Sequence, residues 1–366
     1  MARAGLGPGW TCLRANDFDP KKGAAYQANW GDDALIVGDV GRLTPSDLPG
    51  SADLAWASFP CQDLSLAGSG AGLKGGRSGT FWPFWKLIES LGERRPKMIV
   101  LENVCGALHS HGGRDFCAIS DALAGAGYRF GGVVIDAVHF VPQSRPRLFV
   151  IAVRAELYAE GTLASQSDVW HPAMLRTAYE RLSPRTKAQW VWWKLPSSPL
   201  RNTSFSDVIE GDPRSVRWHT RAETTRLLGM MSEVNREKVR TAKQSGRRMV
   251  GGVYKRTRLD ELGNKVQRAE VRFDDIAGCL RTPVGGSSRQ TILIVDGDRI
   301  RSRLLSTREA ARLMGLPETY VLPENYNEAY HLTGDGVVVP VVRFLAQNVL
   351  EPLLKPRNVE KRKKAA

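Results

Sequence analysis

The chain has 366 residues, 42% of them hydrophobic, which suffices for one large globular domain with a smaller one inserted or appended. No apolar run reaches the length of a membrane span and the N-terminus lacks a signal-peptide pattern, so we expect a cytoplasmic protein without a membrane partner. The net charge of +14, from 52 Lys and Arg against 38 Asp and Glu, favours a polyanionic partner, with nucleic acid ahead of an acidic membrane surface. Five cysteines without a CxxC pair argue against a disulfide framework and a zinc site.

The first 157 residues alternate short β-rich runs with helix-length or Gly-rich connections. This pattern predicts an α/β domain whose mostly parallel sheet is covered by helices on both faces. The expected strands span residues 11–15, 34–38, 52–58, 98–102, 133–138 and 147–153.

The composition changes between residues 158 and 299, which are irregular, tryptophan-rich and then strongly basic. Residues 236–272 contain twelve Lys or Arg and four Asp or Glu, more than half of the excess positive charge of the chain. We interpret the segment as a smaller domain that contacts nucleic acid, with the tryptophans as packing residues rather than base-stacking platforms.

A regular pattern returns in residues 300–366. Ser306 and Glu309 have the spacing of a capping box, with Gly and Pro following as stop signals, which predicts a short helix. A second helix is expected from about Val339, with Pro340 in its first turn. We expect the basic tail after it to be disordered and to touch phosphates nonspecifically.

Reactive and charged side chains lie at the ends of several predicted strands. They are Cys61 in ASFPCQDLS, Glu102 in LENVCG, Arg145 and Arg147 in PQSRPRLFVI, and Asp17 with Phe18 in ANDFDP. Because ligands of an open α/β sheet bind at the rim formed by its strand ends, we expect these groups to meet at one site.

With these segments the sequence resembles the DNA cytosine-C5 methyltransferases. The resemblance rests on Pro60-Cys61-Gln62, Glu102-Asn103-Val104 and Gln143-x-Arg145-x-Arg147, which follow the order and approximate spacing of the family's motifs. It implies a Rossmann-like S-adenosylmethionine-dependent methyltransferase sheet in residues 1–157, a target-recognition domain in 158–299, and C-terminal helices in 300–366 that return to the catalytic domain. The implied reaction is transfer of a methyl group from S-adenosylmethionine to C5 of cytosine in double-stranded DNA.

This reaction explains the residue types. A Cys61 thiolate that attacks carbon 6 would add electron density to the ring, so that carbon 5 can take the methyl group, and loss of the C5 proton would then release the thiol. An ordinary thiol, with a pKa of about 8.5, is mostly protonated near neutrality, so Cys61 needs a helix N-terminus or a nearby arginine. Glu102 would stabilise the charge that moves toward N3 of the ring. By resemblance, Arg145 and Arg147 would hold the cytosine O2 and neighbouring groups.

The cofactor would bind near the end of the strand that precedes Asp17. A carboxylate at such a strand end can accept hydrogen bonds from both ribose hydroxyls, so Asp17 is the candidate ribose-binding residue. Read alone, Asp17 would equally well cap a helix that starts at Pro20. By resemblance, the other cofactor-binding residues are Phe18 against the adenine, Asp39 and Val40 at its edge, and Pro60 at the methionine end.

A base inside a duplex cannot reach such a pocket, so the target cytosine must be flipped out. The Gly-rich stretch after Cys61 is interpreted as a loop that closes over the extruded nucleotide, and RTPVGGSSRQT at residues 281–291 as a loop that enters the major groove. The candidate DNA-binding residues in these segments are Gln62, Ser65, Lys74, Arg77, Arg281, Ser287 and Arg289. We expect a monomer of bacterial or phage origin, with a cognate restriction endonuclease as a candidate partner.

Single motifs allow other interpretations. Cys61 alone would more often be a buried inert thiol. The segment GAGLKG at residues 70–75 matches a nicotinamide-type GxGxxG, but it does not lie directly between the first strand and a helix. His109 and His111 form an HxH pair without further ligands at metal spacing, so we expect no metal site.

Two features depart from the family's pattern. Its members open with a strand and an FxGxG loop that binds the methionine part of the cofactor, and nothing similar precedes ANDFDP, so we expect the sheet to lack its first strand between the second and fourth. A start codon assigned too late explains the intact motifs, whereas a catalytically impaired DNA-binding remnant is the alternative and an RNA substrate a third possibility. In TGDGVVVP, Asp335 replaces the family's asparagine and adds a negative charge near the cofactor's carboxylate end.

Overall fold

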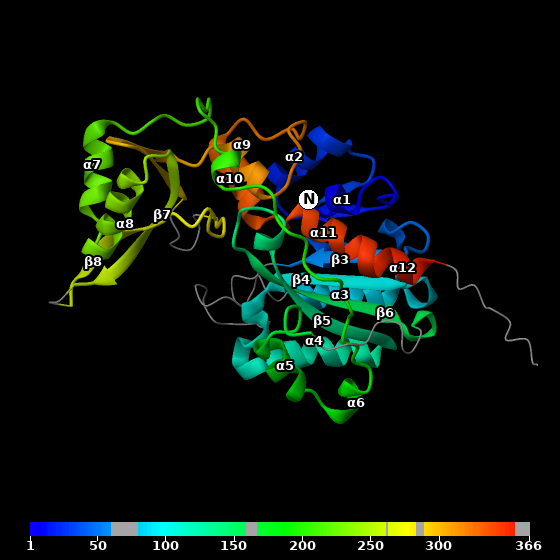
Figure 1. The fold of residues 1–366 in the computed structure, drawn as a ribbon. Helices are drawn as coiled ribbons and strands as arrows, with labels where there is room; N and C mark the ends of the chain where they lie inside the picture. The colour runs from blue at the N-terminus through cyan, green and yellow to red at the C-terminus, as the bar shows by residue number, and fades with distance from the viewer. Residues whose placement is uncertain (60–79, 159–166, 261–262, 283–288, 356–366) are drawn as a thin grey trace, which may run out of the picture.

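The computed structural model describes residues 1–59, 80–158, 167–260, 263–282 and 289–355. Figure 1 shows a larger part, which contains both ends of the described chain, and a smaller part to its left. The predicted site residues that lie outside the described residues are Pro60, Cys61, Gln62, Ser65, Lys74, Arg77 and Ser287.

The larger part is built on a four-stranded sheet with the order β3-β4-β6-β5. The strand bounds are Leu54–Ser58 (β3), Met98–Val104 (β4), Tyr128–Asp136 (β5) and Pro146–Arg154 (β6). β3 and β4 are parallel, whereas β6 is antiparallel to both β4 and β5. This sheet is therefore mixed rather than mostly parallel, because β5 returns directly into β6 through residues 137–145.

A second, smaller sheet consists of the parallel strands β1 (Ala15–Asp17) and β2 (Leu35–Val37), joined by α2 (Pro20–Trp30). The strand expected at residues 11–15 is thus placed a few residues later in the chain. In the described part of the chain β1 and β2 pair only with each other, so this small sheet is not hydrogen-bonded to β3.

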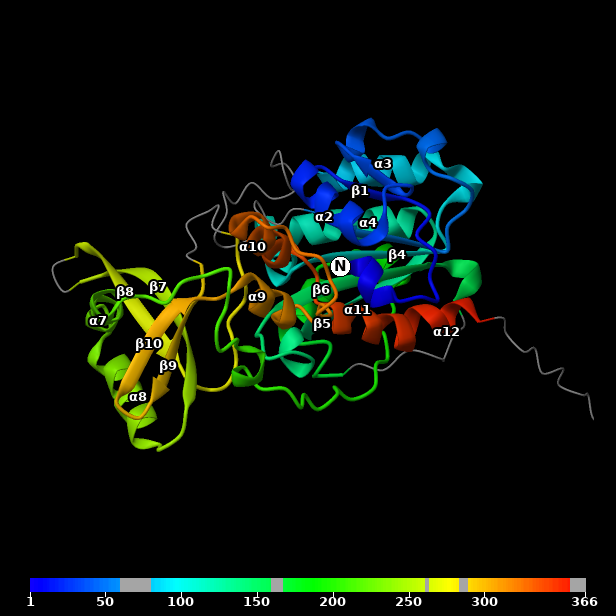
Figure 2. The same cartoon turned by 90° about the horizontal axis from the view of Figure 1, so that it is seen from above.

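Apolar side chains fill both faces of the four-stranded sheet, as the alternation along β4 shows. Met98 and Val100 belong to one buried core, and Ile99 and Leu101 belong to another. The first core is closed by α9 (Thr307–Leu313) and α11 (Val339–Leu345), and the second by α3 (Phe81–Ser90), α4 (Arg114–Gly125) and α5 (Ala173–Glu180). Figure 2 shows α3 and α4 on one side of the sheet and α9 and α11 on the other. The larger part therefore has three layers, with the sheet between two sets of helices.

Two of the C-terminal helices begin at the residues that the sequence predicts. Ser306 and Glu309 form the predicted capping box of α9, and α11 begins at Val339 with Pro340 in its first turn. α10 (Tyr326–Asp335), α11 and α12 (Glu351–Leu354) together form a stretch that is long and apolar enough to cross a membrane by length and composition. This corrects the expectation that no such run exists, although 44% of its most apolar window is buried inside the protein. The N-terminal helix α1 (Ala2–Leu6) packs on α11.

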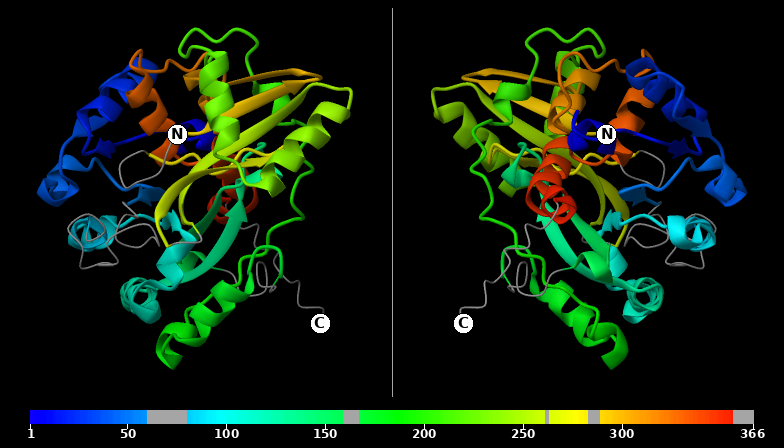
Figure 3. Two further views of the ribbon diagram at one scale, coloured as in Figure 1. Left: turned by 90° about the vertical axis from the view of Figure 1, so that its left-hand side faces the viewer. Right: turned by 90° about the vertical axis from the view of Figure 1, so that its right-hand side faces the viewer.

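The smaller part contains an antiparallel sheet with the order β10-β9-β7-β8. Its strands are β7 (Met249–Leu259), β8 (Lys265–Arg272), β9 (Thr291–Asp296) and β10 (Arg299–Leu304). Two helices, α7 (Arg221–Gly229) and α8 (Glu233–Gln244), cover the face that is turned away from the larger part (Figures 1 and 3). The small sheet thus continues past residue 299, whereas α5, α6 (Pro184–Lys187) and Trp190 pack with the larger part.

A buried ion pair joins the two parts where β10 leads into α9. Arg303 donates to both carboxylate oxygens of Glu309, at 2.7 and 2.6 Å, and neither side chain is exposed. The backbone N–H groups of Ser306 and Glu210 donate to the same carboxylate, each at 2.7 Å. Glu309 therefore holds the last strand of the small sheet, the start of α9 and the segment that enters the small domain in one place.

Candidate active site

The end of β4 carries a buried ion pair between Glu102 and Arg147. Arg147 lies opposite Val104 in the antiparallel register, and alternate residues of a strand share a face, so its side chain stands beside Glu102. Arg147 Nε is 3.3 Å from Glu102 Oε1, and the two side chains are only 15% and 8% exposed. These two side chains meet at the strand ends, as predicted.

The strand β3 leads toward this pair. Its last residue, Ser58, is the register partner of Glu102, and the side-chain amide of Asn103 donates to the carbonyl of Phe59 at 3.2 Å. Cys61 follows two positions later in the chain, outside the described residues.

Arg145 is buried, and its guanidinium group binds the main chain. Nη1 donates to the carbonyl of Leu280 at 2.9 Å, and Nη2 donates to the carbonyls of Gly334 and Gly336 at 2.8 and 2.7 Å. Nη1 also donates to the sulfur of Cys279 at 3.4 Å. These contacts differ from the expected contact with cytosine, because they engage all the terminal donors of the side chain and leave only Nε.

Cys279 is a thiol at this site that the sequence motifs did not indicate. Its sulfur accepts hydrogen bonds from Arg145 and Arg147, at 3.4 and 3.8 Å. Burial alone would raise the pKa of this thiol, but the guanidinium groups of Arg145 and Arg147 outweigh it and lower the pKa. Burial instead raises the pKa of Cys105 to about 11. No sequence pattern separated Cys279 from the other cysteines, because its partners are more than a hundred residues away in the chain.

The predicted cofactor residues gather at the carboxyl ends of β1 and β2. Asp17 Oδ1 accepts a hydrogen bond from the N–H of Asp19, and it is Asp19 that caps α2. Asp17 Oδ2 accepts none from the described residues, and burial raises the pKa of the carboxyl group. The ring of Phe18 is 76% exposed beside it. Asp39, two residues after the end of β2, caps the short 3-10 helix that starts at Val40.

The extra negative charge of Asp335 has a partner. Lys22 Nζ, on α2, lies 2.6 Å from Asp335 Oδ2, at the end of α10. Burial alone would lower the pKa of Lys22, but Asp335 raises it. The substitution of asparagine by aspartate is therefore balanced by a cation next to Asp17.

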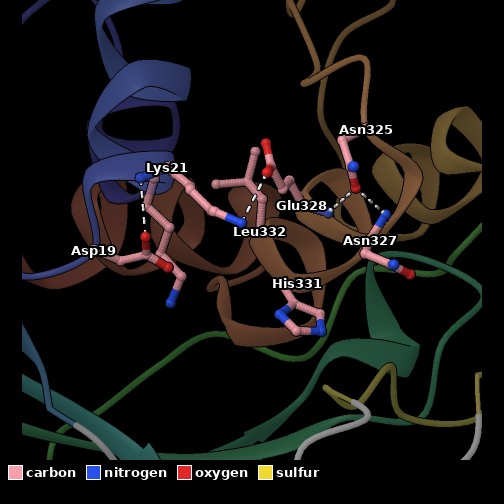
Figure 4. Close-up of a pocket in the computed structure, with 8 residues that line it drawn as sticks. Asp19, Lys21, Asn325, Asn327, Glu328, His331 and Leu332 are labelled. Carbon is pink, nitrogen blue, oxygen red and sulfur yellow. Dashed lines mark hydrogen bonds and ion pairs between the residues drawn. The ribbon is translucent and has the colours of Figure 1, made fainter.

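A polar cavity of about 170 Å³ lies between the N-terminal ends of α2 and α10 (Figure 4). The Lys21–Glu328 ion pair, at 2.9 Å, crosses it, and Asn325 caps α10 at its edge. None of the predicted site residues lines it, so it is distinct from the Glu102–Arg147 site. In the described part of the chain, no cluster of three or more His, Cys, Asp or Glu side chains could hold a metal ion.

Two of the predicted DNA-binding residues flank the segment 283–288. Arg281 is exposed, and its backbone lies against Gly334 of α10. Arg289 donates to Asn327 and lies over the ring of Tyr326, 5.7 Å from its centre. Both arginines therefore lie next to α10, and Arg289 stands two residues before β9.

The family to which this chain belongs follows from its similarity to known proteins. A sequence profile of the C-5 cytosine-specific DNA methylases matches residues 2–351. The chain belongs to that family. This match confirms the resemblance that the three motifs indicate. Members of the family use S-adenosylmethionine as the methyl donor.

Relatives of this methylase align along nearly its whole length. It is 22% identical to the type II methyltransferase M.MspI of Moraxella over 93% of its own chain and 65% of the relative. It is 22% identical to M.HhaI of Haemophilus parahaemolyticus over 93% of its own chain and 88% of that relative. Among solved structures, the methyltransferase EhMeth of Entamoeba histolytica superposes with a TM-score of 0.58 at 12% identity, over 93% of this chain and 90% of that one, which shows a shared fold.

Proposed function

We propose that this methylase transfers a methyl group to C5 of a cytosine that is flipped out of duplex DNA, with Cys61 as the covalent nucleophile. The observation that carries the proposal is the buried Glu102–Arg147 pair at the end of β4, beside the end of the strand that leads to Cys61. A fixed acid and a fixed guanidinium group at one point form a site for a flat, polar ring with several acceptors.

The residues divide the chemistry as follows. The Cys61 thiolate attacks carbon 6, and Glu102 shares a proton with N3 as negative charge develops there. Arg147 holds O2 of the ring and, by its charge, favours the thiolate over the thiol. Loss of the C5 proton after methyl transfer restores the C5–C6 double bond and expels the thiolate.

The residues at the ends of β1 and β2 fit the cofactor. A half-buried carboxylate with one oxygen that accepts no hydrogen bond from the described residues suits a ribose diol, and the exposed Phe18 ring suits a purine face. Asp17, Phe18, Asp39 and Val40 would hold S-adenosylmethionine, which supplies an electrophilic methyl group when bound.

Arg145 takes a positioning role in this scheme. It stands two residues before Arg147 and holds Leu280, Gly334 and Gly336 by their carbonyls. It thereby fixes the strand that presents Arg147 to the end of α10, where Asp335 pairs with Lys22 near the cofactor residues.

The proposed partner is double-stranded DNA, bound by a monomer in the cytoplasm of a bacterium. The type II names of the relatives support a cognate restriction endonuclease as a further partner. A second candidate function is DNA binding without methyl transfer, and it is favoured by the separation of the β1–β2 sheet, which carries the proposed cofactor residues, from the four-stranded sheet.

The test is a covalent trap. The chain is incubated with duplex DNA that contains 5-fluorocytosine and with S-adenosylmethionine, and a denaturation-stable adduct is expected because fluorine cannot leave as the C5 proton does. Cys61→Ser should abolish the adduct, and Cys279→Ser, which changes a thiol that contacts Arg145 and Arg147, should retain it. An adduct that survives Cys61→Ser would overturn the mechanism, and DNA binding without any adduct would support the second candidate.

A further inference from the structure

The two faces of the small sheet have different surroundings. On β7, Val253 points into the core under α7 and α8, whereas Val250 belongs to the core shared with the main sheet. On β9, Leu293 and Ile294 divide in the same way. Because the side chains of a strand alternate between its two faces, every second residue after Val250 points toward the larger part of the protein, away from α7 and α8.

That face leads from the active site into a row of arginines. Tyr254 packs on Gly278, where a Cβ atom would overlap its hydroxyl group, and Gly278 precedes the Cys279 that contacts Arg147. Arg256 lies two residues, about 7 Å of strand, beyond Tyr254, and its guanidinium group stands 5.9 Å from the tyrosine ring centre.

Arg256 is paired across the ribbon with Arg268 of β8. Like charges directly opposite each other destabilise an antiparallel pair. Glu270 offsets part of this charge by binding Arg256 at 3.4 Å and Arg258 at 2.5 Å, but Arg268 has no ion-pair partner among the described residues. Both arginines are exposed. Two exposed arginines side by side are suited to bind a polyanion.

We propose that the β7–β8 ribbon enters the major groove of the DNA, and that Arg256 and Arg268 determine the sequence specificity of methylation by reading guanines close to the target cytosine. A two-stranded ribbon fits the major groove, and arginine binds guanine O6 and N7 in a bidentate manner. Glu270 orients Arg256 and Arg258 before binding. The proposal rests on the proposed DNA methylation, and it adds residues outside the segment 281–291.

The test is selection of bound duplexes from a random pool by the full-length protein, followed by binding measurements on the selected site. Arg256→Gln and Arg268→Gln should each lose one selected guanine and bind the wild-type site roughly tenfold to a hundredfold more weakly, with nonspecific binding nearly unchanged. Arg236→Gln is the matched control, because Arg236 is 48% exposed and paired with an acid at 3.7 Å, as Arg256 is 53% exposed and paired at 3.4 Å, but it lies on α8.

Two results would overturn the inference. One is that both variants select the same sequences as the wild type. The other is an equal loss of affinity for all sequences, with a smaller salt dependence, which would identify phosphate contacts instead. Methylation of the selected duplex is measured separately, so that a failure of the proposed reaction, with selection intact, is distinguished from a failure of the specificity proposal.

Discussion

Glu309→Gln is expected to lower the free energy of unfolding by about 3–5 kcal/mol, as when one partner of a buried ion pair is removed. The Glu309 carboxylate accepts four hydrogen bonds, two from Arg303 and two from backbone N–H groups. Glutamine keeps one acceptor oxygen but turns an NH₂ group toward two of these donors. It also leaves the guanidinium charge of Arg303 without compensation at a site that has no exposure.

A loss of this size is a large part of the roughly 5–15 kcal/mol that stabilises a typical protein. It is measured by urea unfolding, followed by circular dichroism, from the shift of the midpoint and the slope of the transition. The matched control is Glu318→Gln, which removes the same charge from the Arg312–Glu318 pair, where the side chains are 28% and 62% exposed. An exposed pair contributes about 0–1 kcal/mol. Equal effects of the two variants would refute the reasoning that burial makes the Glu309 pair strong.

Three further predictions concern the site and the pH dependence. Glu102→Gln should lower the single-turnover methylation rate roughly 10²- to 10⁴-fold with DNA affinity nearly kept, and a rate within tenfold of wild type would contradict its role. Lys22→Met should weaken S-adenosylmethionine binding about fivefold by calorimetry, and adding Asp335→Asn should restore it. Burial lowers the pKa of His171 from 6.5 to about 4, so the folded state takes up its proton less readily. Stability should therefore fall by up to about 3 kcal/mol between pH 6.5 and pH 4, with His171→Gln removing this dependence in urea unfolding.

Sequence patterns predicted the features that depend on neighbouring residues. The capping box of α9 and the buried strand β4 follow from spacings of a few residues, and the Glu102–Arg147 contact follows from two strand ends. The contacts of Arg145 did not, because its partners at Leu280 and Gly336 are 135 and 191 residues away in the chain.

The small sheet shows the same limit. Residues 236–272 were recognised by their charge, but Gly and charged side chains hid the alternation of β7 and β8. The face that each arginine occupies depends on which residues lie in the core under α7 and α8, such as Val253 and Ala269, and this is decided by packing with distant helices.

The β7–β8 ribbon has one buried face and one exposed face, and this difference affects how the DNA-contacting residues can evolve. The residues that hold the ribbon in place, Val253, Ala269 and Val271, are buried on one face, while Arg256 and Arg268 stand in solvent on the other. Substitutions at the two arginines leave this buried core unchanged and remove only surface contacts, such as those of Arg256 with Tyr254 and Glu270. If the two arginines read the target as proposed, single substitutions there would change the target preference with little loss of stability.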